Sequence, residues 1–196
     1  MVEGTGPAET VYEVTQHPKP QAIVVYCSDP RFQTAFRQFI EKELGLAEGE
    51  FIPLVIGGGA GVLAHREQLP KDFKVLKERL EMHLSQFLSV RRLILINHED
   101  CKYYGVLREK LPHLFGAHPD STTAKQRGDL GTVARALLHL LSSRGTIELY
   151  YAKFVDPEHT KAAFERIALS EGGSVDVPSG TAPSARAKRR SSSEWL

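Results

Sequence analysis

Short apolar runs that alternate with segments of helical periodicity constrain the fold of this chain more than any other feature. The first run, AIVVY at residues 22–26, is continuous and rich in β-branched side chains, which is typical of a strand buried on both faces. Similar runs predict further strands at residues 51–56, 93–96 and 146–155. Strands that alternate with helices form an α/β domain, so we expect a mostly parallel sheet of four to five strands with helices on both faces.

Between these strands, apolar side chains recur at the spacing of helices that bury one face. The pattern predicts helices at residues 30–44, 70–88, 106–114 and 130–141, and another from residue 156. Two of them begin at an Asp-Pro pair, Asp29-Pro30 and Asp156-Pro157, because Asp suits the N-cap and Pro the first helical position. Residues 116–128 are polar and are predicted to form a loop.

The length of 196 residues suits one domain with a segment at either end. We expect an irregular lead-in over residues 1–20, which contains several prolines, and the α/β domain over residues 21–171. Residues 172–196 are dominated by Gly, Ser, Pro, Ala and Arg, a composition typical of a disordered tail.

Charge and hydropathy exclude several classes of protein. Since 25 Lys and Arg nearly balance 24 Asp and Glu, the chain lacks the basic surplus that nucleic-acid binding requires. No apolar run approaches the roughly 18–20 residues that span a bilayer. The N-terminus has neither the basic nor the apolar segment of a secretory signal. We therefore expect a cytoplasmic protein with no nucleic-acid or membrane partner.

The two cysteines of the chain each follow a predicted core strand. Cys27 ends the first, and His98 and Cys101 follow the third. Parallel strands end at one edge of the sheet, where open α/β sheets bind their ligands. Two Cys and one His match zinc, and three protein ligands leave a fourth position open, as in catalytic zinc sites. The sequence therefore predicts one zinc ion per chain, held by these three residues.

Each of these residues has a plainer explanation when it is taken alone. A free cysteine is among the most buried residue types, Asp29 suits a helix cap, and Arg31 suits a solvated helix surface. Cys27 and Cys101 are also compatible with a redox pair without metal, which would leave His98 unexplained. Only their combination at one sheet edge favours a metal site.

A glycine-rich segment, Gly57 to Gly61, follows the second predicted strand. Glycines let the backbone approach a small substrate closely and offer its N–H groups as donors. A turn into the next helix explains the same residues equally well. The segment lacks the Gly-x-Gly-x-x-Gly pattern, which disfavours nucleotide binding.

The segments Cys27-Ser28-Asp29-Pro30-Arg31 and His98-Glu99-Asp100-Cys101 resemble, in this order, the Cys-x-Asp-x-Arg and His-x-x-Cys motifs of the β-class carbonic anhydrases. The likeness covers residues 20–155 in layout, and the glycine-rich segment has a counterpart in that family. The chain departs from the family in carrying Lys102 and Tyr103 after the second cysteine, where glycine is usual, and it looks like a divergent branch.

The resemblance implies a zinc-dependent lyase that hydrates CO2 to bicarbonate through zinc-bound hydroxide. Zinc would be held by Cys27, His98 and Cys101. Asp29 would accept the hydrogen bond of the hydroxide, and Arg31 would pair with Asp29 and hold it off the metal. The pocket for CO2 and bicarbonate would be lined by Gly58, Gly59, Ala60 and Gly61. The family also implies a homodimer or higher homo-oligomer, with the site near the subunit interface.

Two further functions fit the same ligands. One is hydrolysis of another small linear substrate, such as carbonyl sulfide or carbon disulfide. The other is a non-catalytic module that binds zinc and has lost the substrate pocket. CO2 hydration kinetics on protein of known zinc content separates these possibilities.

Overall fold

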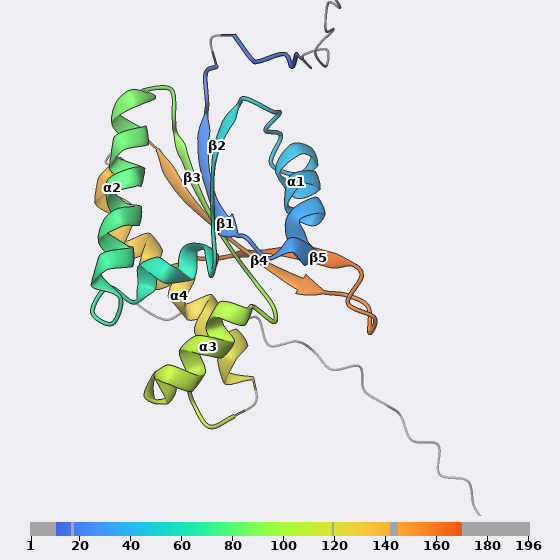
Figure 1. Ribbon diagram of the computed structural model, residues 1–196, viewed down its shortest axis with the longest axis vertical. Helices are drawn as coiled ribbons and strands as arrows, with labels where there is room; N and C mark the ends of the chain where they lie inside the picture. Colours follow the sequence, from blue (N-terminus) through green and yellow to red (C-terminus); the bar gives the residue numbers. More distant parts are fainter. Residues whose placement is uncertain (1–10, 17, 119, 142–144, 170–196) are drawn as a thin grey trace, which may run out of the picture.

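The computed structural model describes residues 11–16, 18–118, 120–141 and 145–169 (Figure 1). The predicted tail, 172–196, lies outside the described residues, as does the first half of the predicted lead-in. The described residues up to Gln21 form neither helix nor strand. Within the described ranges, no helix combines the length and apolar character needed to cross a bilayer.

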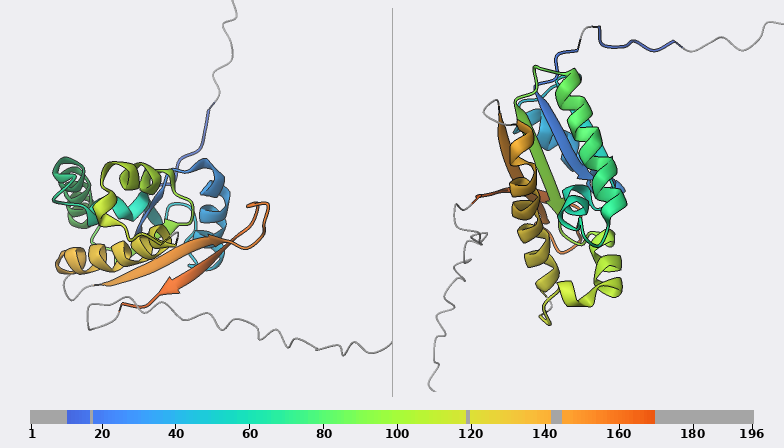
Figure 2. Two further views of the ribbon diagram at one scale, coloured as in Figure 1. Left: turned by 90° about the horizontal axis from the view of Figure 1, so that it is seen from below. Right: turned by 90° about the vertical axis from the view of Figure 1, so that its left-hand side faces the viewer.

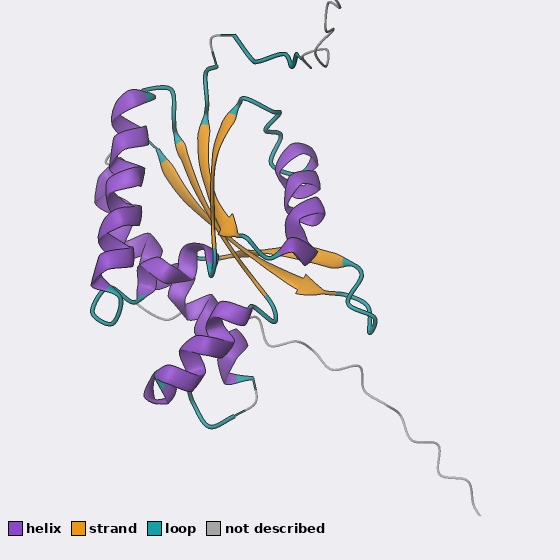
Figure 3. Ribbon diagram, viewed as in Figure 1, coloured by secondary structure: helices purple, strands orange, loops and turns teal. Residues whose placement is uncertain are grey.

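One five-stranded sheet, with the order β2-β1-β3-β4-β5, forms the centre of the fold (Figure 3). The strands are β1 (Ala22–Cys27), β2 (Phe51–Ile56), β3 (Arg92–His98), β4 (Thr146–Phe154) and β5 (Ala162–Ile167). Strands β1 to β4 are parallel, and β5 pairs with β4 in the antiparallel sense. The predicted mostly parallel α/β sheet is thereby confirmed, and the central strands β1 and β3 end side by side.

Helices cover both faces of this sheet (Figures 1 and 2). Side chains of β1 and β3 alternate between the faces. Ile23, Val25 and Leu93 pack with α2 (Pro70–Gln86) and α4 (Ser121–Leu141) on one side. Ala22, Val24 and Ile94 pack with α1 (Gln33–Lys42) on the other. The remaining elements are α3 (Lys102–Lys110) and the 3-10 turns η1 (Pro30–Phe32), η2 (Gly59–Ala64) and η3 (Pro112–Leu114).

The helix predicted from residue 156 is wrong, because the segment forms a hairpin turn and strand β5. The carboxylate of Asp156 accepts hydrogen bonds from the backbone N–H groups of Thr160 and Lys161, which closes the turn. Phe164 then stacks on Phe39 of α1, with ring centroids 4.0 Å apart. The helical prediction relied on two apolar positions and an Asp-Pro pair, and such a short pattern also fits a turn followed by a strand.

The predicted loop over residues 116–128 is also partly wrong, since α4 begins at Ser121. The first buried side chains of α4 are polar, and Gln126 and Asp129 are among them. Hydrophobic periodicity detects helices that pack by apolar contact, so it misses a helix that begins with buried polar groups. Of these residues, Gln126 contacts the end of β3 through the backbone carbonyl of His98.

Candidate metal centre

The predicted ligands Cys27, His98 and Cys101 meet at the carboxyl edge of the sheet. Their potential ligand atoms all lie within 4.8 Å of one another, and the two Sγ atoms are 3.8 Å apart. All three residues are buried, with exposed fractions of 4%, 1% and 6%. Strands β1 and β3 bring Cys27 and His98 together, and Cys101 caps the N-terminus of α3.

The imidazole of His98 has one nitrogen free for a metal. Its Nδ1 lies 2.7 Å from the backbone carbonyl oxygen of Glu99, which can only accept, so Nδ1 carries the proton. The other nitrogen, Nε2, is buried without a hydrogen-bond partner. A buried acceptor without a partner is costly unless a cation or donor occupies its lone pair. This arrangement fits a histidine ligand whose tautomer is fixed by the backbone.

The two thiols interact directly. The Sγ atoms of Cys27 and Cys101 lie within hydrogen-bond distance, and this interaction lowers the pKa of Cys27 and raises that of Cys101. Only one of the pair is therefore readily deprotonated, because two buried thiolates this close repel each other. A divalent cation would remove that penalty, and two thiolates with one imidazole are a zinc donor set. The residues present thus fit zinc.

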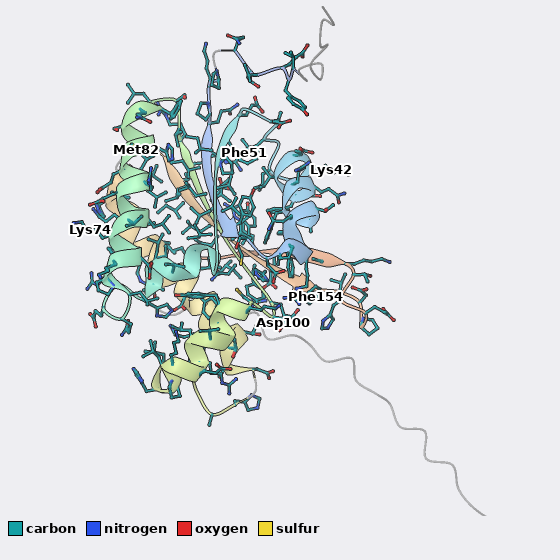
Figure 4. All side chains as sticks on the ribbon, in the orientation of Figure 1. Lys42, Phe51, Lys74, Met82, Asp100 and Phe154 are labelled. Carbon is teal, nitrogen blue, oxygen red and sulfur yellow. The ribbon has the colours of Figure 1, made fainter. Side chains whose placement is uncertain are left out.

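Arg31 links the two loops that carry the ligands. Its Nε and Nη2 donate to the carboxylate of Asp29, with Nη2 2.8 Å from Oδ2. Its Nη1 donates to Oδ2 of Asp100 at 2.7 Å, and Nη2 also donates to the Asp100 backbone carbonyl at 2.8 Å. Asp100, which takes a left-handed conformation with φ of 52°, directly precedes Cys101. Figure 4 labels Asp100 and Phe154, which both contact Arg31.

Asp29 is fixed by its own loop as well as by the Arg31 side chain. Its Oδ1 accepts from the backbone N–H of Arg31, which confirms the predicted cap at this helix start. Hydrogen bonds from Arg31 lower the pKa of Asp29. Gln33, in the first turn of α1, donates from Nε2 to the backbone carbonyls of Cys27 and Asp29. The loop after β1 is therefore held in one conformation.

A cavity of about 380 Å³ lies beside this centre. Its wall contains both cysteines, Asp29, Arg31 and Gly58, together with Lys102 and Tyr103, which directly follow the second cysteine. Gly58 has a φ of 88°, and the ring of Tyr103 packs so closely on it that an added Cβ would lie 2.5 Å from Cδ1. A small molecule in this cavity would reach both the cysteines and the Asp29–Arg31 pair.

Of the four predicted pocket residues, one lines the cavity and three do not. Gly58 lines the cavity, whereas Gly59, Ala60 and Gly61 are buried behind it and do not line it. A Cβ on Gly59 would lie 2.9 Å from the carbonyl oxygen of Ile96, and one on Gly61 would lie 2.1 Å from the hydroxyl of Tyr104. These glycines permit close packing of η2 on the sheet, which sequence alone did not distinguish from a pocket role.

Replacement of Gly59 by alanine should destabilise the fold. The φ of Gly59 is 54°, and its neighbours are backbone atoms that cannot move aside. We expect the free energy of unfolding to fall by about 2 kcal/mol or more from strain and overlap. Gly128→Ala is the matched control, because Gly128 lies in α4 with nothing within 4 Å of its added Cβ. It should raise stability by about 0.5–1 kcal/mol. Urea unfolding measures both, and equal stabilities of the two variants would contradict the packing role.

The sequence did not predict the buried polar residues near the metal centre. Asp129 accepts a hydrogen bond from the hydroxyl of Tyr104 at 2.9 Å, and its Oδ2 lies 3.1 Å from Nε2 of His65. Gln126 contacts the end of β3, where its side chain donates to the carbonyl of His98 and its backbone carbonyl accepts from Asn97. No spacing rule points to them, because each contact joins elements far apart in the sequence.

No protein-family model matches the sequence, and no curated protein is significantly similar to it. Solved structures do match. Two are β-carbonic anhydrases, isoform I from Trichomonas vaginalis and CafA from Aspergillus fumigatus. They are 14% and 15% identical to this chain, with TM-scores of 0.47 and 0.49. The matches cover 79% and 78% of this chain and 87% and 77% of theirs.

A third match is a carbonic anhydrase from Glaciozyma antarctica. It is 19% identical, covers 75% of this chain and 82% of its own, and has a TM-score of 0.41. All three matches combine a sequence identity below 20% with a TM-score below 0.5.

Proposed function

We propose that this chain is a zinc-dependent carbonic anhydrase, a lyase that converts CO2 and water to bicarbonate and a proton. The observation that carries the proposal is the buried Cys27–His98–Cys101 cluster, with the Asp29–Arg31 pair beside it on the wall of one cavity. The cluster supplies the donors for zinc, and the pair supplies an oriented carboxylate at the same place. Either feature alone would have several explanations.

Zinc would be held by the two sulfurs and by Nε2 of His98. When bound there, zinc supplies a Lewis acid that makes water a better nucleophile near neutral pH. The protein fixes the ligands beforehand, since the Glu99 carbonyl sets the tautomer of His98 and Gln33 holds the carbonyl of Cys27. We expect one zinc per chain.

Asp29 and Arg31 would orient the nucleophile. The side chain of Asp29 is only 7% exposed, and Arg31 keeps its pKa below the usual range. The carboxylate is therefore ionised and can only accept hydrogen bonds. We infer that it accepts one from the attacking water in the cavity. The oxygen lone pair would then face the carbon of CO2, and orientation of this kind accounts for a large part of catalysis.

A non-catalytic zinc-binding module is the second candidate, and one observation favours it. Lys102 and Tyr103 stand on the cavity wall where the related family has glycine, and the ring of Tyr103 covers Gly58. The bulk of these side chains leaves less room beside the cysteines. Hydrolysis of carbonyl sulfide or carbon disulfide remains a further possibility, because it would use the same ligands and the same cavity.

Stopped-flow kinetics with a pH indicator tests the proposal. Protein loaded with one zinc should accelerate CO2 hydration, and the same protein stripped of zinc should not. Parallel assays with carbonyl sulfide and carbon disulfide identify a different small substrate. A fully zinc-loaded protein that is inactive on all three would favour the non-catalytic module.

The proposal also includes the oligomeric state of the protein and its location in the cell. We expect a homodimer, as the family resemblance implies, and light scattering after size-exclusion chromatography measures its mass directly. We also expect the protein in the cytoplasm, because a reducing compartment keeps Cys27 and Cys101 as thiols available to zinc. A monomer at micromolar concentration would contradict the dimer and leave the zinc site unaffected.

A further inference from the structure

Gln126 is a buried polar side chain of α4 that reaches the backbone of the ligand His98. It is 0% exposed, and its Nε2 donates to the carbonyl oxygen of His98 at 2.9 Å. Its Oε1 accepts from the hydroxyl of Tyr151 on β4 at 2.8 Å. Because Tyr151 donates to Oε1, the amide of Gln126 is fixed with its nitrogen toward His98.

The peptide group between His98 and Glu99 is held at both ends. The side chain of Gln126 donates to the carbonyl oxygen of His98, and the backbone N–H of Glu99 donates to the carbonyl oxygen of Ala152 at 2.8 Å. The next carbonyl, that of Glu99, lies 2.7 Å from Nδ1 of His98. This fixed peptide anchors the residue that carries the Glu99 carbonyl, and that carbonyl in turn sets the direction of the imidazole.

Asn97 adds a reciprocal contact. Its Nδ2 donates to the backbone carbonyl of Gln126 at 2.9 Å, so two successive residues of β3 are tied to one residue of α4. Asn97 is 2% exposed. These two hydrogen bonds tie the end of β3 to α4.

We propose that Gln126 is a positioning residue for the metal centre. It holds the His98–Glu99 peptide, and through it the imidazole, so that Nε2 points at the metal position before metal arrives. This inference rests on the zinc site proposed above and makes no use of CO2 hydration. If Gln126 acts in this way, its loss lowers zinc affinity even though it is not itself a ligand.

Gln126→Met tests this directly, because methionine has a similar shape without the amide. Loss of a hydrogen-bonding partner behind a ligand typically costs 10–100-fold in metal affinity, and we expect the zinc dissociation constant to rise by about that factor. Tyr151→Phe removes only the hydroxyl that orients the amide. It should therefore also raise the zinc dissociation constant, but by a smaller factor. Val133→Ala is the matched control, since Val133 is also fully buried on α4 but packs against the apolar core.

Two measurements distinguish positioning from a general loss of stability. Competition with a chromophoric chelator gives the zinc dissociation constant, and the visible spectrum of the cobalt(II)-loaded protein reports the geometry of its ligands. We expect Gln126→Met to change both, and Val133→Ala to lower the unfolding midpoint while it leaves both unchanged.

Zinc affinities of Gln126→Met and Tyr151→Phe that equal those of Val133→Ala and wild type would overturn the inference. If Gln126→Met does not fold, Tyr151→Phe decides by the same criterion. Failure of the proposed function is recognised separately, because a wild-type protein that binds zinc in a Gln126-dependent way but does not hydrate CO2 supports the positioning role and contradicts the activity.

Discussion

Replacement of His98 by alanine, or of Cys27 or Cys101 by serine, is expected to abolish stable zinc binding. Each change removes one of three donors from a buried site, and two protein ligands hold the cation less tightly than three. The loss should exceed the roughly 100-fold that removal of a supporting hydrogen bond costs. Elemental analysis after reconstitution and exchange into metal-free buffer measures the zinc content per chain.

His113→Ala provides the control for this experiment. His113 lies in η3 on the surface and takes no part in the cluster, so its variant should keep one zinc per chain. Circular dichroism shows whether each variant remains folded. Full zinc content in any of the three ligand variants would remove that residue from the site, and retention in all three would disprove the metal centre.

Replacement of Arg31 by alanine is expected to lower CO2 hydration by at least about 100-fold while zinc stays bound. Arg31 is not a ligand, but it supplies the hydrogen bonds that orient Asp29 and tie it to the loop of Asp100. Without them, only the backbone N–H of residue 31 holds the carboxylate, and the misplacement of an orienting group costs on the order of 100-fold in rate. Stopped-flow kinetics and zinc content on the same sample measure both quantities.

Two further variants, Arg31→Lys and Arg37→Ala, serve as comparisons in that experiment. Lysine keeps the charge but lacks the planar fork that binds Asp29 and Asp100 together, so it should recover little of the activity. Arg37 is exposed on α1, and its variant should behave as wild type. Near-normal turnover in Arg31→Ala would show that the orientation of Asp29 does not matter.

The sequence was sufficient for the parts of the structure that local patterns encode. Continuous apolar runs predicted β1 and β3, and residues directly after these strands must share one sheet edge in a parallel fold. Cys27, His98 and Cys101 were therefore predicted together before any geometry was known. The cap formed by Asp29 was equally local, since its partner is two residues away.

The missed features depend on contacts between distant segments. Gln126 lies 28 residues from His98 in the sequence, and its segment looks like a polar loop until the end of β3 is placed against it. Arg31 was expected to pair with Asp29, but its second partner, Asp100, lies 69 residues away. The hairpin of β5 was missed because Phe164 packs, partly buried, against α1 and β4 and does not belong to a helix.

X-ray absorption at the zinc edge tests the proposed ligand set, because it counts the sulfur and nitrogen neighbours of the bound ion. We expect two sulfurs at about 2.3 Å, as Zn–S bonds in proteins have, with the remaining neighbours nitrogen or oxygen. Cys101→Ser should reduce the sulfur count of any residual zinc to one. A wild-type spectrum with fewer than two sulfurs would contradict zinc binding by Cys27, His98 and Cys101.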